Sequence, residues 1–304
     1  MQENNKEEIE KMRDESRTET MRAVSGEVEK ILYKPIPVLD HGFIRVIDYM
    51  GNDSSIVQAA RVSYGVGTKR VQEDRGLINY LMRHGHTTPF EMCEIKLHVK
   101  LPIFVMRHWV RHRTANINEY SARYSVLSNE FYIPELEQIA RQSETNKQGK
   151  SDVAMDAAKG QEVIDTLADF SKSAYEKYSH MLDDLGLTRE LARTILPVSV
   201  YTEMYWKIDL HNLLHFLKLR ADSHAQYEIR CYANKILDIV KAWVPFTYDA
   251  FVNYRQNAVS VSKKCIELNK RMLKGEEITQ ENSGLSKGEW QEFLTAFDLR
   301  DLIP

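Results

Sequence analysis

The sequence predicts an α+β fold in which mixed helices pack on a small, mainly antiparallel sheet. Residues 93–101 alternate apolar and polar side chains, which indicates a strand with one buried face. Segments with apolar residues at helical spacing separate this strand from the others, so the strands are not consecutive. The chain has 304 residues and is 43% hydrophobic, which is enough for a substantial core.

We expect one main domain, residues 36–255, between two extensions. Residues 1–35 form a charged N-terminal extension, and the mixture of Glu, Lys and Arg over its first 30 positions is typical of a frayed helix or a disordered arm. Residues 256–304 predict a helical C-terminal extension. In that extension Ser286 and Glu289 have the spacing of a capping box ahead of Trp290.

In the first part of the main domain, the sequence predicts a strand and two helices. The strand covers residues 43–50, and residues 52–54 supply a cap for a helix that ends at Ser63. A second helix begins near Glu73 and stops at the His-Gly-His of residues 84–86. The two histidines there fit either capping of the helix end or contact with a ligand.

Helices dominate the second part. A polar surface loop is expected at residues 143–152, followed by a long amphipathic helix that Gly186 ends. The remaining predicted elements are a short helix at 189–195, a strand at 198–210, and helices at 213–219 and 226–243. Arg193 and Arg220 each interrupt or close an apolar run, so both are expected at the margin of the core.

The composition narrows the class of protein. The formal net charge is −3, which does not favour a nucleic-acid or membrane partner. The three cysteines are far apart and form no CxxC pair, which argues against a disulfide framework or a structural zinc site. Without a long apolar run or a secretion signal, we expect a soluble protein with reduced thiols in the cytoplasm.

The densest group of charges lies between Arg107 and Arg123 and contains four arginines and two histidines. Pro102 is expected at the first position of a helix whose apolar start packs inward and whose end carries these cations. Consecutive helical side chains diverge by about 100°, so residues 111–113 cannot all face one small ligand from a regular helix. Either the helix ends there or the three side chains address different groups.

Beyond this triplet, Glu119, Ser121 and Arg123 alternate with other residues, so in an extended chain they point to one side. A carboxylate, a hydroxyl and a guanidinium on one face suit a polar ligand that carries a phosphate. Ser121 has no nucleophile-elbow motif, so its hydroxyl is expected to contact phosphate rather than to attack a substrate.

Two pairs of histidines have the spacing of metal ligands on a helix. His108 and His112 are four residues apart, but the glutamate of a zinc-protease helix is missing and the flanking arginines would repel a dication. His211 and His215 repeat the spacing and are expected to donate or accept hydrogen bonds at a ligand. We therefore predict no metal site.

Several blocks in order along the chain resemble the flavin-dependent thymidylate synthases. The triplet at residues 111–113, followed seven residues later by Ser121, is similar to the RHR-x7-S signature of that family. Further similar blocks are AARVSYG at 59–65, HGHTTPFE at 84–91, EYSARYS at 119–125 and LRADSHAQYEIR at 219–230. The resemblance runs from about residue 42 to residue 254, so residues 36–255 are identified as the catalytic domain.

The resemblance implies a methyltransferase of nucleotide biosynthesis, a flavoprotein that converts dUMP to dTMP by reductive methylation. The cofactor would be tightly bound FAD, with NADPH and 5,10-methylenetetrahydrofolate as cosubstrates. The family is homotetrameric and shares its sites between subunits. The sequence has no GxGxxG after a strand, so FAD is expected to be held by side chains and helix ends.

Site residues follow from the resemblance position by position. Those matching dUMP contacts are His108, Arg111, Glu119, Ser121, Arg123, Arg193 and Arg220. Arg220 is the catalytic candidate, because it matches the position that stabilises negative charge at the uracil imide. Those matching FAD contacts are Ser63, His86, Thr88, Glu91, Arg111, His112, Arg113, Glu119, Asp209, Leu210, His211 and His215. His108 replaces a glutamine of many relatives, and Asp209 and His215 replace an asparagine of some.

Two other classes of function remain open at this point. A module for single-stranded RNA would use the same arginines with Tyr120, Tyr124 and Tyr132 as stacking platforms, although the near-neutral charge counts against it. A flavin oxidoreductase that binds a nucleotide without methylating it would share most of the site. Flavin absorbance excludes the first class, and an assay of dTMP formation separates the second.

Overall fold

The computed structural model describes residues 6–62, 71–142 and 149–299 in two compact units. The larger unit is Met1–Phe251 and the smaller is Val252–Pro304, and each is described here by itself. Ser63 and the end predicted for its helix lie outside the described residues. Among the described helices, none combines the length and the apolar character that a membrane span requires.

A five-stranded sheet organises the larger unit. The strands lie in the order β1 (Ile36–Val38), β2 (Gly42–Met50), β3 (Glu94–Pro102), β7 (Tyr201–Asp209) and β4 (Asn116–Glu119). All four pairings of neighbouring strands are antiparallel. The predicted α+β class with a small antiparallel sheet is therefore confirmed.

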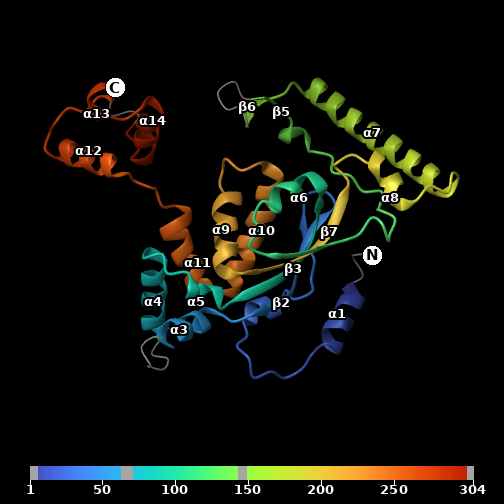
Figure 1. The fold of residues 1–304 in the computed structure, drawn as a ribbon, viewed down its shortest axis with the longest axis horizontal. Coiled ribbons are helices and arrows are strands. Elements are labelled where there is room, and N and C mark those ends of the chain that lie inside the picture. Colours follow the sequence, from blue (N-terminus) through green and yellow to red (C-terminus); the bar gives the residue numbers. More distant parts are fainter. Residues whose placement is uncertain (1–5, 63–70, 143–148, 300–304) are drawn as a thin grey trace. The chain divides into compact units, whose positions relative to one another are not determined.

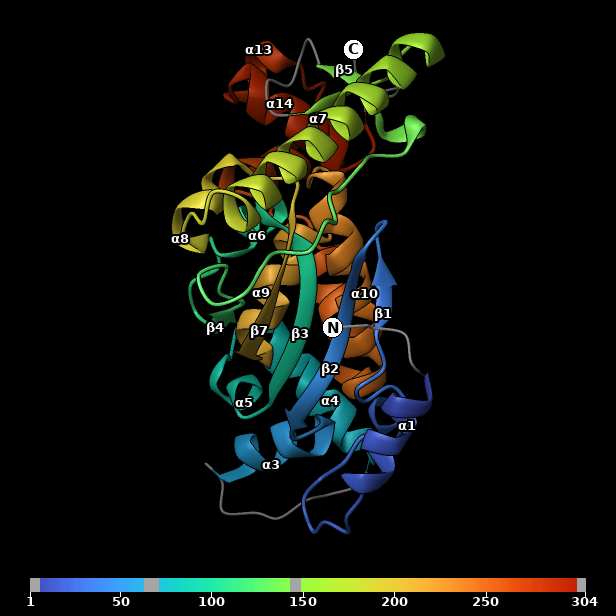
Figure 2. The same ribbon diagram turned by 90° about the vertical axis from the view of Figure 1, so that its right-hand side faces the viewer.

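Helices α9 (Leu210–Arg220) and α10 (Tyr227–Trp243) lie along one face of this sheet (Figures 1 and 2). Four buried aromatic rings join the layers. Trp109 meets Trp206 of β7 edge-on at 5.1 Å, Phe216 of α9 at 4.8 Å and Tyr232 of α10 at 5.9 Å between ring centroids. Such large apolar surfaces contribute most of the driving force that holds the helices to the sheet.

The other face of β3 corrects one expectation. The alternation of residues 93–101 predicts a single buried face, but His98 and Lys100 are also buried, with 5% and 4% of their surface exposed. His98 Nε2 lies 2.8 Å from a carboxylate oxygen of Glu203, and Lys100 Nζ donates to Glu130 at 2.8 Å. Glu203 and Glu130 provide the polar contacts that water would otherwise make, so His98 and Lys100 can be buried. The polar face of β3 is therefore not exposed along its whole length.

The N-terminal extension contains two helices, α1 (Lys6–Glu15) and α2 (Gly26–Glu29). From the sequence, either a frayed helix or a disordered arm was expected there. Helix α3 (Asp53–Val62) starts as predicted, because Asn52 Oδ1 accepts hydrogen bonds from the amides of Ser54 and Ser55 at 3.1 and 3.2 Å.

Helix α4 (Val71–Arg83) also ends where the sequence predicts. Gly85 has a φ of 69°, and the amide of His86 donates to the carbonyl of Leu81 at 3.0 Å. A glycine takes this left-handed conformation without the steric cost of a Cβ atom. The short helix α5 (Thr88–Glu91) then leads into β3.

Helix α6 (Ile103–Trp109) follows β3 directly and settles the question of the charged triplet. The helix ends at Trp109, so residues 111–113 lie beyond it. Pro102 was expected at the first helical position, which is wrong by one residue. It is the last residue of β3 and precedes the helix with φ −64° and ψ 146°, an extended conformation that suits a cap residue.

Between β4 and β7 the longest element is a helix. The helix α7 (Ala157–Asp183) begins with Asp156 as its cap and ends before Gly186, whose φ is 66°. Of the surface loop expected at residues 143–152, positions 143–148 lie outside the described residues. Positions 150–152 belong to β6 (Lys150–Ala154), which pairs with β5 (Ala140–Gln142). The remaining elements of this unit are η1 (Leu136–Gln138), α8 (Arg189–Ala192), η2 (Arg193–Ile195) and α11 (Pro245–Phe251).

The smaller unit has its own core. It contains η3 (Val252–Gln256), α12 (Lys263–Leu273), α13 (Gln280–Ser283) and α14 (Lys287–Ala296). Leu268, Trp290 and Phe293 are among its buried residues. The predicted capping box is confirmed, since Ser286 Oγ accepts from the amide of Glu289 and the Glu289 carboxylate accepts from the amide of Ser286 at 2.8 Å.

Candidate active site

The end of α6 fixes the start of the charged triplet. Trp109 is fully buried among the aromatic rings of the core, and the amide of His112 donates to its carbonyl at 3.0 Å. The chain therefore leaves the core at a defined point and turns at once. Arg111 and Arg113 are exposed, whereas His112 between them is half-buried.

The triplet lines a cavity of about 350 Å³ together with α9. Arg111, His112, Arg113 and Thr114 form one wall, and Asn212, His215 and Arg220 of α9 form another. Five of these residues were predicted as ligand contacts, and the fold brings them together from positions about one hundred residues apart. The volume falls in the range of small-molecule sites, and three guanidinium groups make it strongly cationic.

Arg220 is held on one edge of its guanidinium group. Its Nε donates to Nε2 of His112 at 3.0 Å, and its Nη2 donates to the carbonyl of His108 at 3.4 Å. Within the described part of the chain, Arg220 has no carboxylate partner. The edge formed by Nη1 and the second N–H of Nη2 is left as a planar fork, which matches two neighbouring acceptor atoms of a ligand.

The same hydrogen bond fixes the state of His112. Because Arg220 Nε–H is a donor, His112 Nε2 must be an unprotonated acceptor, and a neutral ring then carries its proton on Nδ1. Burial, the charge of Arg220 and the neighbouring His215 lower the pKa of His112 from 6.5 to about 4. The ring can thus hold Arg220 and offer an Nδ1–H donor near neutral pH.

We expect nitrogen NMR of histidine-labelled protein to show His112 titrating near pH 4. Because the pKa is lower in the folded than in the unfolded chain, this group contributes stability above about pH 6.5 that is lost as the pH falls toward 4. Arg220→Gln removes a neighbouring positive charge and should raise the His112 midpoint. A midpoint near 6.5 in the unaltered protein would contradict the arrangement.

A second group of predicted residues surrounds the start of α9. His86 and Thr88 are exposed and Glu91 is half-buried at α5, while Asp209 caps α9. Its carboxylate accepts from the amide of Asn212 at 2.9 Å and from the Asn212 side chain at 2.7 Å. Asp209 therefore has a structural role whatever ligand it meets, and it orients Asn212 at the cavity wall.

Leu210 and His211 continue this group. His211 is half-buried, but Leu210 is fully buried and its amide donates to the carbonyl of Cys93 at 2.8 Å. Of the residues in this group, Leu210 is therefore the least accessible to FAD, which it was predicted to contact. Asn212 was not predicted as a site residue. It follows Asp209 by three residues, and this spacing of a helix cap indicates a contact between the two side chains.

The third group lies at the end of β4 and in the turn that follows. Glu119 is exposed and accepts from the hydroxyl of Thr202 at 3.0 Å. The expectation that Glu119, Ser121 and Arg123 share one side of an extended chain is wrong. The amides of Tyr124 and Ser125 donate to the carbonyl of Ser121, so the chain forms a turn after β4.

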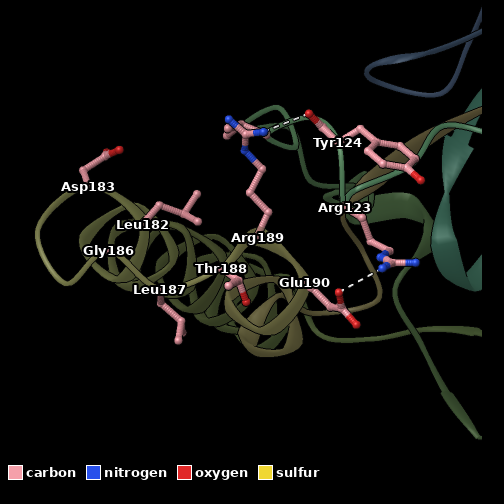
Figure 3. Close-up of a pocket in the computed structure, with 10 residues that line it drawn as sticks. Arg123, Tyr124, Leu182, Asp183, Gly186, Leu187, Thr188, Arg189 and Glu190 are labelled. Carbon is pink, nitrogen blue, oxygen red and sulfur yellow. Dashed lines mark hydrogen bonds and ion pairs between the residues drawn. The ribbon is translucent and has the colours of Figure 1, made fainter.

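This turn faces α8 across a cavity of about 490 Å³ (Figure 3). Arg123 and Glu190 form an ion pair of 3.1 Å, and Arg189 Nη1 donates to the carbonyl of Tyr124 at 2.9 Å. Arg193 donates through Nε to the carbonyl of Glu190 at 3.3 Å. The fold thus joins Arg123 and Arg193 in one region, and it adds Arg189 and Glu190, which no pattern in the sequence singled out as site residues.

Comparison with known proteins supplies a family. Residues 45–246 match the family described as thymidylate synthase complementing protein. A flavin-dependent thymidylate synthase of Rickettsia bellii is 58% identical over 284 residues, which cover 90% of this chain and 97% of the relative. One of Wolbachia pipientis is 58% identical over 279 residues, which cover 92% and 98% of the two chains.

Solved structures agree with the sequence relatives. A UMP/dUMP methylase, PolB from Streptomyces cacaoi bound with 5-Br dUMP, has a TM-score of 0.66 and 34% sequence identity, and the match covers 73% of this chain and 99% of that one. With two thirds of the chain matching the family and close relatives matching nearly its whole length, this chain belongs to the flavin-dependent thymidylate synthase family.

Proposed function

We propose that this protein converts dUMP to dTMP by reductive methylation, with 5,10-methylenetetrahydrofolate as the carbon donor and FAD and NADPH as the reducing system. The family, the relatives and the similarity to a dUMP methylase support this reaction. The observation that carries the proposal is the free fork of Arg220 in a cationic cavity, because it suits the paired acceptors of a uracil imide.

Arg220 would activate the nucleotide. Uracil C5 is a poor nucleophile until electron density is pushed into the ring. No cysteine lines either cavity, so the push must come from polarisation of the imide rather than from a thiol adding at C6. A guanidinium held by His112 and by the carbonyl of His108 is preorganised to stabilise negative charge as it develops at N3 and the adjacent carbonyl.

The phosphate of dUMP would bind at the turn after β4. Arg123 and Arg193 lie on either side of Glu190, and Ser121 starts the turn. The guanidinium groups of Arg123 and Arg193 suit the dianionic phosphate of dUMP, as the resemblance implies for these positions, while the imide belongs with Arg220. Glu119 and Arg111 would contact the nucleotide between these ends, as the resemblance implies.

The residues present fit FAD. Arg111 and Arg113 offer guanidinium groups for a pyrophosphate, and His112 and His215 offer ring donors in the same cavity. His86, Thr88, Glu91 and His211 would bind at the other end of α9, whose 11 residues span about 16 Å. Bound FAD supplies the hydride transfer of the reaction, and these side chains hold and orient it.

We also propose a homotetramer with shared sites. The predicted residues fall into separate groups within one chain, since the cavities at Arg220 and at Arg123 have no lining residue in common. In addition, α7 exposes Phe170 with 62% of its surface accessible, and Val163 and Leu167 with more than a third. An apolar face of this kind suits a subunit contact. Light scattering of the flavin-loaded protein tests the assembly.

The domain assignment remains a proposal of the same kind: catalytic residues 36–255 between extensions at 1–35 and 256–304. Location in the cytoplasm is proposed only from the reduced thiols. Deletion of residues 256–304 tests the assignment, because a catalytic domain that ends at residue 255 should still form dTMP and retain flavin. Loss of folding in that variant would place the boundary later.

The function is tested by incubating the protein with dUMP, NADPH and 5,10-methylenetetrahydrofolate and measuring dTMP. The purified protein should show flavin absorbance, and dTMP should form only with all three substrates. NADPH oxidation without dTMP would favour a flavin oxidoreductase instead. A colourless protein that binds single-stranded RNA would favour the binding module.

Ser121→Ala is expected to weaken dUMP binding by about 1.5–3 kcal/mol, the usual loss for one hydrogen bond to a charged group. Turnover at saturating dUMP should remain, because the hydroxyl binds and does not attack. Calorimetric titration with dUMP and the dependence of rate on dUMP concentration give the two quantities. Abolished turnover with unchanged affinity would instead identify Ser121 as a nucleophile.

Removal of all three thiols should leave dTMP formation measurable. Burial raises the pKa of the Cys93 thiol to about 12, and burial also raises that of Cys231, so neither forms a thiolate near neutral pH. We suggest Cys93→Ala with Cys231→Ser and Cys265→Ser. Complete loss of dTMP formation in a folded, flavin-bound variant would point to a covalent cysteine mechanism.

A further inference from the structure

Glu190 is an acidic residue in the midst of three arginines. Its carboxylate pairs with Arg123 Nη2 at 3.1 Å, and its main-chain carbonyl accepts from Arg193 Nε at 3.3 Å (Figure 3). Arg189 precedes it and fixes the facing turn through the carbonyl of Tyr124. About half of each side chain in the Arg123–Glu190 pair is exposed, so a ligand can reach the pair from the cavity.

The carboxylate and a phosphate need the same donors. A phosphate bound by the guanidinium of Arg123 requires its N–H groups, and one of them already serves Glu190. A carboxylate left beside the bound phosphate also repels it, because both are anionic. An exposed ion pair of this kind is worth at most about 1 kcal/mol, so the phosphate can displace it.

We propose that Glu190 competes with the nucleotide phosphate for Arg123 and thereby speeds release of the product. This inference rests on the proposed function. Since dUMP and dTMP carry the same phosphate, the competition lowers the affinity for both. Affinity differences at one site are expressed mainly in the dissociation rate, and product release limits turnover in many enzymes. Glu190 is thus a positioning residue that sets how long the nucleotide stays bound.

The experiment measures nucleotide binding to the flavin-loaded protein by calorimetry, and dTMP dissociation by displacement with excess dUMP. Glu190→Gln keeps the shape of the side chain and removes its charge. We expect dUMP and dTMP to bind about threefold to tenfold tighter and dTMP to leave correspondingly more slowly. Deoxyuridine, which has no phosphate, should bind with unchanged affinity.

Asp183→Asn is the matched control. Asp183 lines the same cavity, but among the described residues it forms no ion pair with an arginine. The control should change dUMP affinity by less than about twofold, since it removes the same charge without freeing a donor. A gain as large as that of Glu190→Gln would mean that general charge, and not competition for Arg123, sets the affinity.

A double variant isolates the competing partner. In an Arg123→Gln background, Glu190→Gln should tighten binding by less than about twofold, because the shared donor is gone and only the direct repulsion between carboxylate and phosphate is relieved. Weaker or unchanged dUMP binding in the single Glu190→Gln variant would overturn the inference. Weaker binding would mean that Glu190 orients Arg123 for the nucleotide, and unchanged binding that it has no effect on affinity. Unchanged dUMP binding in the single Arg123→Gln variant would likewise overturn the inference. Failure of the proposed function is a different result, because the unaltered protein would then neither bind dUMP nor form dTMP.

Discussion

Arg220→Lys should lose dTMP formation by about 10²–10³-fold while it keeps its flavin and the reduction of that flavin by NADPH. Lysine retains the positive charge but has neither the Nε donor that meets His112 nor the planar fork that is free in the cavity. The expected loss is that of one preorganised donor to a developing negative charge. Flavin occupancy, NADPH oxidation and dTMP formation are to be measured on one preparation.

Lys218→Arg provides the control for that experiment. Lys218 is exposed two residues earlier on α9, so its exchange tests whether a changed cation on this helix matters by itself. The control should retain dTMP formation. If Arg220 only anchors the end of α9, Arg220→Lys will instead lower flavin content or thermal stability. Near-normal dTMP synthesis by the Arg220→Lys variant would contradict the assignment of Arg220 as the catalytic residue.

Asp74→Ala should lower the free energy of unfolding of the larger unit by about 3–5 kcal/mol. Asp74 of α4 pairs with Arg61 of α3 at 2.8 Å, and both side chains are only about a tenth exposed, at 11% and 10%. Removal of the carboxylate leaves a guanidinium buried without its counter-charge. Thermal unfolding followed by circular dichroism should show a midpoint lower by roughly 6–20 °C.

Two further variants separate the charge effect from packing. Glu15→Ala breaks the exposed pair with Lys11, whose side chains are 66% and 75% exposed, and should change stability by less than about 1 kcal/mol. Arg61→Met combined with Asp74→Leu removes both buried charges and should recover much of the lost stability. If the double variant is as unstable as Asp74→Ala, lost packing rather than the unpaired charge is the cause.

The elements that the sequence predicted well are those decided within a few residues. Asn52 caps α3 through amides two and three positions ahead, and Gly85 ends α4 because its own φ is 69°. The Ser286–Glu289 box closes between neighbours on one turn. The spacing of apolar residues predicted β3 and α10, and this signal is also local, because burial of one face depends only on the spacing of side chains along the chain.

Site residues divide in the same way. The charged triplet, the position of Arg220 at the end of an apolar helix, and the family with its reaction could all be derived from the sequence. Two of the expectations that were wrong concern geometry: an extended chain from Glu119 to Arg123, and a single buried face on β3. Both were wrong because of contacts with residues far along the chain. Arg189 contacts the turn from 65 residues away, and Glu203 meets His98 across 105.

By itself, therefore, the sequence determined the α+β class, most helix ends, the family and the residue types that carry the chemistry. Only the tertiary structure decided which of these residues meet: His112 with Arg220 across 108 positions, and Arg123 with Glu190 across a cavity. The physical reason is range. Caps, turns and periodic burial are fixed by adjacent atoms, whereas a hydrogen bond between distant segments exists only after the sheet and its helices have set their separation.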